Sequence, residues 1–306
     1  MDKLYSIKPQ TAELFRAAQL PVAPVVDLIM RALHEDLDGG VDVTSVATVP
    51  AEQTATLDLA ARSSGTIAGV VPAVAVFDIV GGDDMSASVL VADGSQVGAG
   101  EVIMRIDGFT RQLLTAERTA LNLLCHLSGV ATATQQWVQA LAGTGAQVRD
   151  TRKTTPGFRA LEKYAVRCGG GVNHRMSLSD AALVKDNHVL AAGGVAAAFA
   201  AVRTNFPGVP VEVEVDSLAQ LEEALTAGAD LVLLDNYTPD QMRQAVAINQ
   251  GRAVLEASGG LTLEMAAVVG ATGVNYIAVG ALTHSAMALD IGADLRTAAP
   301  DIAAVD

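Results

Sequence analysis

The sequence predicts an α/β protein in which a small N-terminal α/β domain precedes a TIM-like barrel of parallel strands. After residue 145, short apolar runs alternate with segments of helical period, and strand starts recur at roughly 20–35-residue intervals, the spacing of βα units. Polar or charged residues stand at the end of nearly every apolar run. The run VEVEVD (211–216) places valines on one face and acids on the other, whereas an inner strand of an open sheet is apolar on both faces. A barrel whose mouth is an active site accounts for both observations.

The segments before residue 110 show helical and strand patterns separated by turns, but strands and helices do not alternate regularly. Apolar residues at helical spacing predict a helix over 25–36, and the run 71–82 predicts a buried helix ended by two glycines. Residues 54–69 predict a strand broken at Ser-Ser-Gly, and 86–108 predict strands joined by turns. These elements indicate a small α+β domain.

A long helical stretch over 110–143 separates this domain from the barrel, and we expect two helices interrupted near Ser128-Gly129. The predicted barrel strands are 146–151, 181–186, 211–216, 230–235, 253–258 and 273–280. The predicted helices between them are 160–168, 193–206, 217–228, 238–249 and 262–271.

Composition excludes several classes of protein. The net charge of −14 disfavours binding to nucleic acid or to an anionic membrane surface. The longest run of small apolar residues, 189–202, is too short to span a bilayer, and the first ten residues lack the apolar segment of a secretory signal. Two cysteines give no disulfide framework. We therefore expect a cytoplasmic protein.

One segment opposes the overall charge. Residues 149–188 contain eight Lys/Arg and four Asp/Glu, so that the segment is net +4 within an acidic chain. Four of these cations, Arg152, Lys153, Arg175 and Lys185, stand at predicted strand ends or in a glycine-rich loop, where they predict a site for a small polyanion. Three further cations, at 159, 163 and 167, recur every four residues. This spacing predicts that they lie on one solvent-exposed face of a helix.

Two acids, Glu214 and Asp235, end adjacent predicted strands. They are candidates to hold Mg²⁺ directly or through water, and the alternative is that they cap helices or pair with the lysines. Glu212 and Glu256 are predicted as salt-bridge partners inside the barrel.

Two glycine-rich turns, ASGGLT (257–262) and AVGALTHS (278–285), follow the last two predicted strands and lead into predicted helices. Such turns bind anions, and a phosphate site at the last strands is usual in this barrel. The residues alone thus indicate a barrel enzyme that acts on a phosphorylated, carboxylated substrate.

The same segments resemble a known enzyme family, quinolinate phosphoribosyltransferase, also called carboxylating nicotinate-nucleotide pyrophosphorylase. The resemblance covers about residues 25–292 and is most specific in RDTRKTTPGFRALEKYAVRCGGGVNHRMSLSDAALVKDNHV (149–189). It extends to VEVEVDSLAQLEEAL, LLDN, LEASGG and AVGALTHS. The resemblance implies an N-terminal α/β sandwich domain (1–120, joined by the tail 289–306) and an incomplete barrel of about seven strands (121–288).

The family's reaction converts quinolinate and phosphoribosyl pyrophosphate to nicotinate mononucleotide, CO₂ and pyrophosphate, with Mg²⁺, in NAD biosynthesis. By resemblance, Arg152, Arg175 and Lys185 hold the quinolinate carboxylates beside His174, while Lys153, Glu214 and Asp235 serve ribose, pyrophosphate and Mg²⁺. The resemblance implies further substrate-binding residues: Thr151, Ser258, Gly259, Gly260, Val279, Gly280, Ala281 and His284. It also implies a homodimer in which Arg118 enters the neighbouring subunit's site, and it leaves open any assembly beyond the dimer.

Two classes of alternative remain. A nicotinate phosphoribosyltransferase or a molybdenum-transport-associated paralogue would share much of this pattern, although three cations suit a dicarboxylate and the retained KDNH (185–188) favours the biosynthetic enzyme. A non-catalytic sensor of a phosphorylated ligand would keep the turns but would have no need of Lys153, Glu214 and Asp235 together.

Overall fold

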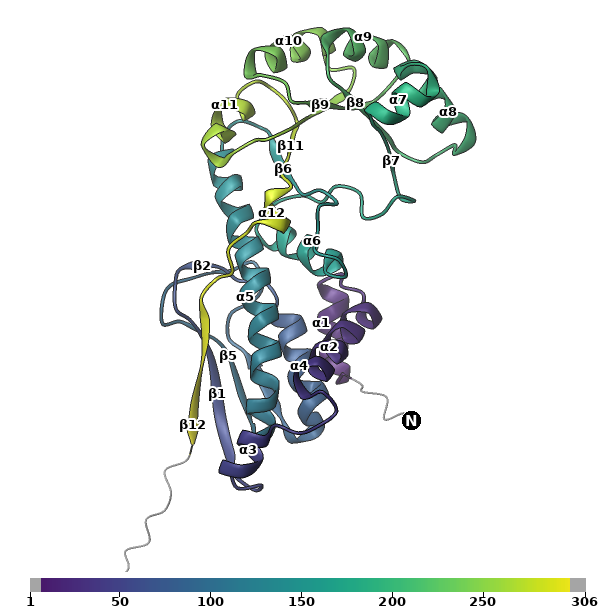
Figure 1. Ribbon diagram of the computed structural model, residues 1–306. Helices are drawn as coiled ribbons and strands as arrows, with labels where there is room; N and C mark the ends of the chain where they lie inside the picture. Colours follow the sequence, from purple (N-terminus) through teal and green to yellow (C-terminus); the bar gives the residue numbers. More distant parts are fainter. Residues whose placement is uncertain (1–6, 298–306) are drawn as a thin grey trace, which may run out of the picture. The chain divides into compact units, whose positions relative to one another are not determined.

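The computed structural model describes residues 7–297, which divide into two compact units (Figure 1). We call them the N-terminal unit (described residues up to 132, 160–168 and 286–297) and the barrel unit (133–159 and 169–285). This division falls after residue 132, whereas the expected one falls after residue 120, and both positions lie within one continuous helix. The terminal residues 298–306 of the expected tail lie outside the described residues.

The N-terminal unit is built on an antiparallel sheet with the order β12-β1-β5-β3. Its strands are β1 (Thr54–Ala61), β3 (Ser86–Val89), β5 (Val102–Phe109) and β12 (Ile291–Thr297). A short pair, β2 (Gly65–Thr66) and β4 (Gln96–Val97), stands apart from this sheet. Strand β12 pairs with β1 along seven residues, so that chain segments from opposite ends of the sequence lie side by side (Figure 1).

Helices complete the core of this unit. They are α1 (Pro9–Ala17), α2 (Val22–Leu37), α3 (Val43–Thr48) and α4 (Val70–Gly81), and the 3-10 turn η1 (Gly82–Asp84) follows α4. All residues of α4 except Val80 are buried, as its sequence, apolar apart from Asp78, predicts. Helices α1 and α3 were not predicted, although Pro9 at the first helical position and Asp42 as an N-cap are local signals for them.

Helix α5 (Thr110–Ala140) runs without interruption for 31 residues, so the expected break near Ser128-Gly129 is wrong. Gly129 allows a neighbouring chain segment to pack against the helix. A Cβ at Gly129 would lie 2.1 Å from the carbonyl oxygen of Met287, which leaves no room for a side chain. Gly129 therefore lets the C-terminal segment approach α5 closely.

Helix α6 (Arg159–Cys168) contradicts the predicted solvated face. Its residues 161–166 are all buried, and Lys163 is fully inaccessible to solvent. Glu162 is equally buried, and its Oε1 lies 2.9 Å from Nε2 of His126. Charged residues at helical spacing indicate a solvent-exposed helix face only when the rest of the protein does not cover that face. Here the N-terminal unit encloses the helix, so the charged side chains of Glu162 and Lys163 are buried.

The barrel unit contains a six-stranded parallel sheet with the order β6-β11-β10-β9-β8-β7. The strands are β6 (Gln147–Arg149), β7 (Ala182–Val184), β8 (Val211–Val215), β9 (Leu231–Asp235), β10 (Val254–Ser258) and β11 (Tyr276–Ala278). An isolated bridge joins Arg149 to Val172, and the described sheet itself has six strands, where the resemblance implies about seven. No pairing among the described residues joins β6 to β7, so the barrel is incomplete (Figure 1).

The connections between strands are helical, as the sequence predicts. They include α7 (Asp186–Ala192), α8 (Val195–Asn205), α9 (Leu218–Thr226), α10 (Pro239–Asn249), η2 (Leu263–Met265), α11 (Ala266–Gly270) and α12 (Ala281–His284). Between residues 7 and 297, no helix combines the length and the apolar character needed to cross a bilayer.

Candidate active site

A cavity of about 670 Å³ lies within the barrel unit at the carboxyl ends of the strands. It is lined by fifteen of the sixteen residues expected at the site: Thr151, Arg152, Lys153, His174, Arg175, Lys185, Glu214, Asp235, Ser258, Gly259, Gly260, Val279, Gly280, Ala281 and His284. The remaining residue, Arg118, is exposed on α5 in the N-terminal unit. Parallel strands place their carboxyl ends at one edge, which is why residues over 130 positions apart in the sequence converge here.

The cavity contains two neighbouring guanidinium groups. Burial and the like charge of Arg152 lower the pKa of Arg175. The Nε atom of Arg152 is buried and has no hydrogen-bond partner among the described residues. Two adjacent cations, one with an unsatisfied donor, have the charge and the hydrogen-bonding capacity to bind an anion with more than one charge.

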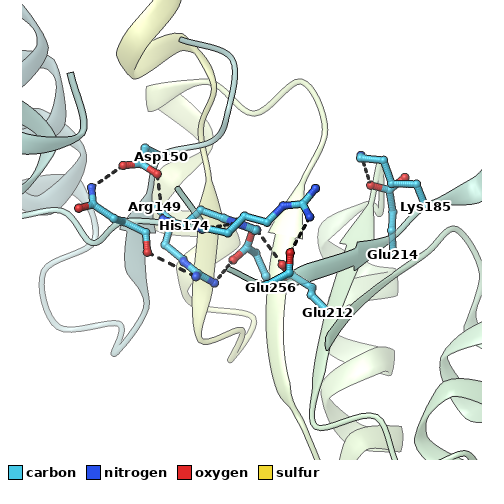
Figure 2. A network of polar contacts seen from close by, with 10 residues as sticks. Arg149, Asp150, His174, Lys185, Glu212, Glu214 and Glu256 are labelled. Atoms are coloured by element: carbon cyan, nitrogen blue, oxygen red, sulfur yellow. Dashed lines mark hydrogen bonds and ion pairs between the residues drawn. The ribbon is translucent and has the colours of Figure 1, made fainter. Parts of the chain in front are cut away.

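The loop that carries Arg175 is fixed by a buried carboxylate. Asp150, at the end of β6, is fully buried and accepts a hydrogen bond of 2.5 Å from Nδ2 of Asn173 and one of 2.8 Å from the backbone N–H of His174 (Figure 2). The Arg175 guanidinium itself donates to the carbonyl of Ala181 at 2.7 Å. The position of Arg175 is therefore set by contacts on both sides of the loop.

A polar network joins Arg149, His174, Glu212 and Glu256 (Figure 2), and two of its members, His174 and Glu256, line the cavity. Arg149 Nη1 lies 2.6 Å from Glu256 Oε2, and His174 Nε2 lies 2.7 Å from Glu212 Oε2. Glu256 is therefore a salt-bridge partner inside the barrel, as the sequence predicts, whereas the neighbour of Glu212 is an imidazole. Burial and the neighbouring Glu212 carboxylate raise the pKa of Glu256 to about 7, although Arg149 opposes the shift.

This network also brings together three groups of the kind that bind metals, since ligand atoms of His174, Glu212 and Glu256 lie within 4.8 Å of one another. His174 Nε2 already lies 2.7 Å from Glu212 Oε2, and Arg149 pairs with Glu256. We therefore interpret the group as a structural polar network.

Glu214 and Asp235 each have one carboxylate oxygen held by a neighbouring donor. Lys185 Nζ lies 2.6 Å from Glu214 Oε2, so Glu214 makes the pairing with a lysine that the sequence analysis gave as an alternative. Asn236 Nδ2 donates a hydrogen bond to Asp235 Oδ2 at 2.8 Å. Both acids line the cavity from adjacent strands. An acid that keeps one oxygen for a ligand suits Mg²⁺, which binds through one or two carboxylates, substrate phosphates and water.

The two glycine-rich turns also line the cavity. Gly259 and Gly260 adopt φ values of 100° and 59°, which favour glycine. A Cβ at Gly280 would lie 2.9 Å from Cδ of Lys153, so this glycine makes room for the lysine side chain. The helices after the turns, α11 and α12, have only five and four residues, so the backbone N–H groups of the turns, more than helix dipoles, would bind phosphate.

The structure adds residues that reasoning from sequence did not assign to the site. The cavity is also lined by Leu183, Leu233, Asn236, Glu256, Leu261 and Ala278. Leu183 and Leu233 resemble ordinary strand residues, and no sequence signal distinguishes them, whereas Leu261 and Ala278 lie within the two glycine-rich segments that the sequence singles out. Asn236 could have been found, because an asparagine directly after a strand-end acid tolerates a left-handed backbone.

Comparisons with known proteins identify the family. Residues 42–128 match the model of the quinolinate phosphoribosyl transferase N-terminal domain, and residues 130–294 match that of its C-terminal domain. The chain is 54% identical over 273 residues to a nicotinate-nucleotide pyrophosphorylase [carboxylating] of Mycobacterium leprae, covering 88% of this chain and 96% of the relative. It is 42% identical over 263 residues to a probable enzyme of that name from Bacillus subtilis, covering 85% and 90%.

A solved structure agrees with these matches. The nicotinate-nucleotide pyrophosphorylase of Francisella tularensis superposes with a TM-score of 0.87 at 37% identity, covering 90% of this chain and 98% of that one. The two family models together span most of the sequence, and each relative is matched over nearly its whole length. The chain belongs to the quinolinate phosphoribosyl transferase family.

Proposed function

We propose that the protein transfers the phosphoribosyl group of phosphoribosyl pyrophosphate to quinolinate and releases CO₂ and pyrophosphate, giving nicotinate mononucleotide. The observation that carries this proposal is the pair of adjacent guanidinium groups, Arg152 and Arg175, in a cavity that also contains Lys185. Quinolinate has two adjacent carboxylates, and two neighbouring cations with an unsatisfied buried donor match that charge. The names of the Mycobacterium leprae and Bacillus subtilis relatives support the same reaction.

The other side of the cavity suits the phosphorylated sugar. The turns at Gly259–Gly260 and Gly280 offer backbone donors, and Lys153 lies against Gly280. We propose that Glu214 and Asp235 hold Mg²⁺ together with the substrate, and that the ion neutralises charge on pyrophosphate. Lys153 would stabilise the negative charge that develops as pyrophosphate departs.

The chemistry requires no organic cofactor. As the bond between the anomeric carbon and pyrophosphate breaks, the pyridine nitrogen of quinolinate forms the new bond to that carbon and becomes cationic. The cationic ring then holds the electron pair left on the ring carbon when the adjacent carboxylate departs as CO₂, and this carbon takes up a proton. The protein contributes orientation of the two substrates and cations that match their charges.

We also propose that the active unit is a cytoplasmic homodimer, in which Arg118 of one subunit completes the quinolinate site of the other. Its support is the family resemblance and the exposure of the Arg118 side chain on α5.

The assay that tests the proposed function supplies phosphoribosyl pyrophosphate and Mg²⁺ with either quinolinate or nicotinate and measures mononucleotide by chromatography. Product from quinolinate is expected. Product from nicotinate alone would favour the monocarboxylate alternative, and binding of phosphoribosyl pyrophosphate without any product would favour the non-catalytic sensor.

A further inference from the structure

Asn236 has a backbone conformation that is rare for a residue with a side chain. It follows Asp235 directly at the end of β9, lines the cavity and adopts a φ of 57°. Asparagine tolerates this left-handed region better than most residues do, but the conformation still has to be held by its surroundings.

Contacts to the next strand hold it. The backbone N–H of Asn236 donates to the carbonyl of Ser258 at 3.0 Å, which ties the end of β9 to the end of β10. The side chain then turns back, and its Nδ2 donates to Asp235 Oδ2 at 2.8 Å. This hydrogen bond occupies one oxygen of the carboxylate and leaves the other for a ligand.

Gly259 makes this arrangement possible. A Cβ at Gly259 would lie 2.2 Å from Oδ1 and 2.7 Å from Cγ of Asn236, far closer than van der Waals contact allows. The φ of Gly259 is 100°, a conformation that favours glycine. Both this conformation and the nearby Asn236 amide exclude a side chain at position 259. The Asn236 amide therefore fills the place that a side chain at position 259 would take. It lies between the glycine-rich turn at Gly259 and the carboxylate of Asp235.

We propose that Asn236 is a positioning residue: it fixes the carboxylate of Asp235 for the sugar-phosphate and its Mg²⁺, and Gly259 provides the space it needs. This inference rests on the proposed function, since it assigns the Asp235 side of the cavity to phosphoribosyl pyrophosphate. Groups that orient a metal- or ligand-binding carboxylate typically affect ligand affinity by about ten- to a hundredfold.

The test compares Asn236→Gly, Asn236→Asp and the control Gln250→Gly. Glycine keeps the left-handed backbone and removes only the amide, whereas aspartate keeps the shape but places a second carboxylate where the donor stood. Gln250 also has a positive φ, 49°, and does not line the cavity, so its replacement reports the effect of a new glycine alone. Calorimetry measures the dissociation constant of phosphoribosyl pyrophosphate in MgCl₂ and, separately, that of phthalate, a dicarboxylate without the ring nitrogen.

We expect Asn236→Gly to weaken binding of phosphoribosyl pyrophosphate by about tenfold or more and Asn236→Asp by at least as much. Phthalate binding should change less than about twofold, and the same split should appear in the KM values of the two substrates. Equal affinity of Asn236→Gly and wild type for phosphoribosyl pyrophosphate would overturn the proposal, as would equal losses for both ligands. A wild-type protein that binds no phosphoribosyl pyrophosphate would instead contradict the proposed function.

Discussion

Lys153 is the residue whose proposed role in the reaction can be separated most cleanly from a role in folding. Its side chain is exposed in the cavity and lies over Gly280. Lys153→Ala should lower kcat by about 10²–10³-fold, because the charge acts on the departing pyrophosphate. Steady-state kinetics with quinolinate measures this, and Arg243→Ala, which removes an exposed cation on α10, is the matched control. Near-normal turnover of a folded Lys153→Ala protein would make the lysine a surface cation only.

Glu256 should make stability depend on pH in a defined direction. Its pKa is raised from 4.5 to about 7 in the folded protein, so the folded state binds more protons than the unfolded state between these values. The free energy of unfolding should therefore fall as pH rises from about 4.5 to 7. Glu256→Gln lacks this titration, although it also weakens the pairing of Arg149.

The difference in unfolding free energy, wild type minus Glu256→Gln, should thus decrease by about 1–3 kcal/mol across this pH range. Urea unfolding at several pH values gives the difference. The pairing with Arg149 strengthens as Glu256 ionises, so it opposes the decrease and is already contained in the raised pKa. A difference that stays constant or rises with pH would show that Glu256 is ionised throughout.

At the scale of residues, the charged and glycine positions of the site could be located from the sequence, whereas residues whose role depends on a neighbour could not. Arg152, Arg175 and Lys185 were predictable because cations at strand ends of an acidic chain usually serve to bind an anion. Lys163 was not, because its burial depends on the enclosure of α6 rather than on its own helical spacing. The role inferred for Asn236 depends likewise on Gly259, which belongs to a different strand end.

Helix α5 provides the clearest prediction at the scale of an element. Alanine is favoured over glycine within a helix by about 1 kcal/mol, so helix propensity alone predicts that Gly129→Ala is stabilising. The Cβ would however meet the Met287 carbonyl at 2.1 Å, and overpacking of this kind costs about 1–3 kcal/mol. We expect packing to dominate and the Tm to fall.

Thermal unfolding checks this expectation. Asn122→Ala, at an exposed position of the same helix, is the control, and its Tm should be unchanged or slightly raised. If Gly129→Ala matched or exceeded the Tm of wild type, the close approach of the C-terminal segment to α5 would not be needed for stability.

The same helix shows where element prediction from sequence fails. The βα rhythm of the barrel was predictable because strand and helix periods differ and alternate over about 130 residues. A glycine within a helical period is ambiguous, because it either ends the helix or admits a neighbouring backbone. Only the position of residues 287–288, far away in the sequence, resolves that ambiguity for Gly129.

At the scale of the whole molecule, the proposed dimer predicts complementation between two inactive variants. Arg118→Ala and Arg152→Ala should each be inactive alone, since each removes a cation from every quinolinate site. After mixing at 1:1, unfolding and reassembly, each mixed dimer would contain one intact and one doubly defective site, so about a quarter of wild-type activity is expected for random pairing. Persistent inactivity in samples shown to contain mixed dimers would place Arg118 outside the partner's site.

The proposed function depends above all on a cavity that selects a dicarboxylate. Nicotinate offers only one carboxylate to the neighbouring Arg152 and Arg175, and a site built around a charged partner discriminates strongly when that partner is missing. We expect a preference for quinolinate of at least about a hundredfold in kcat/KM, equivalent to about 2.7 kcal/mol. Arg175→Ala should reduce this preference, chiefly by weakening the use of quinolinate.

Direct competition measures that preference in one reaction. With quinolinate and nicotinate at equal concentrations, both yield the same mononucleotide and pyrophosphate, but only quinolinate releases CO₂. The ratio of CO₂ to pyrophosphate therefore reports which acid has reacted, and we predict a ratio close to one for the wild-type protein. A ratio of about one half or less would mean that nicotinate is used as well as quinolinate, and it would contradict the dicarboxylate site.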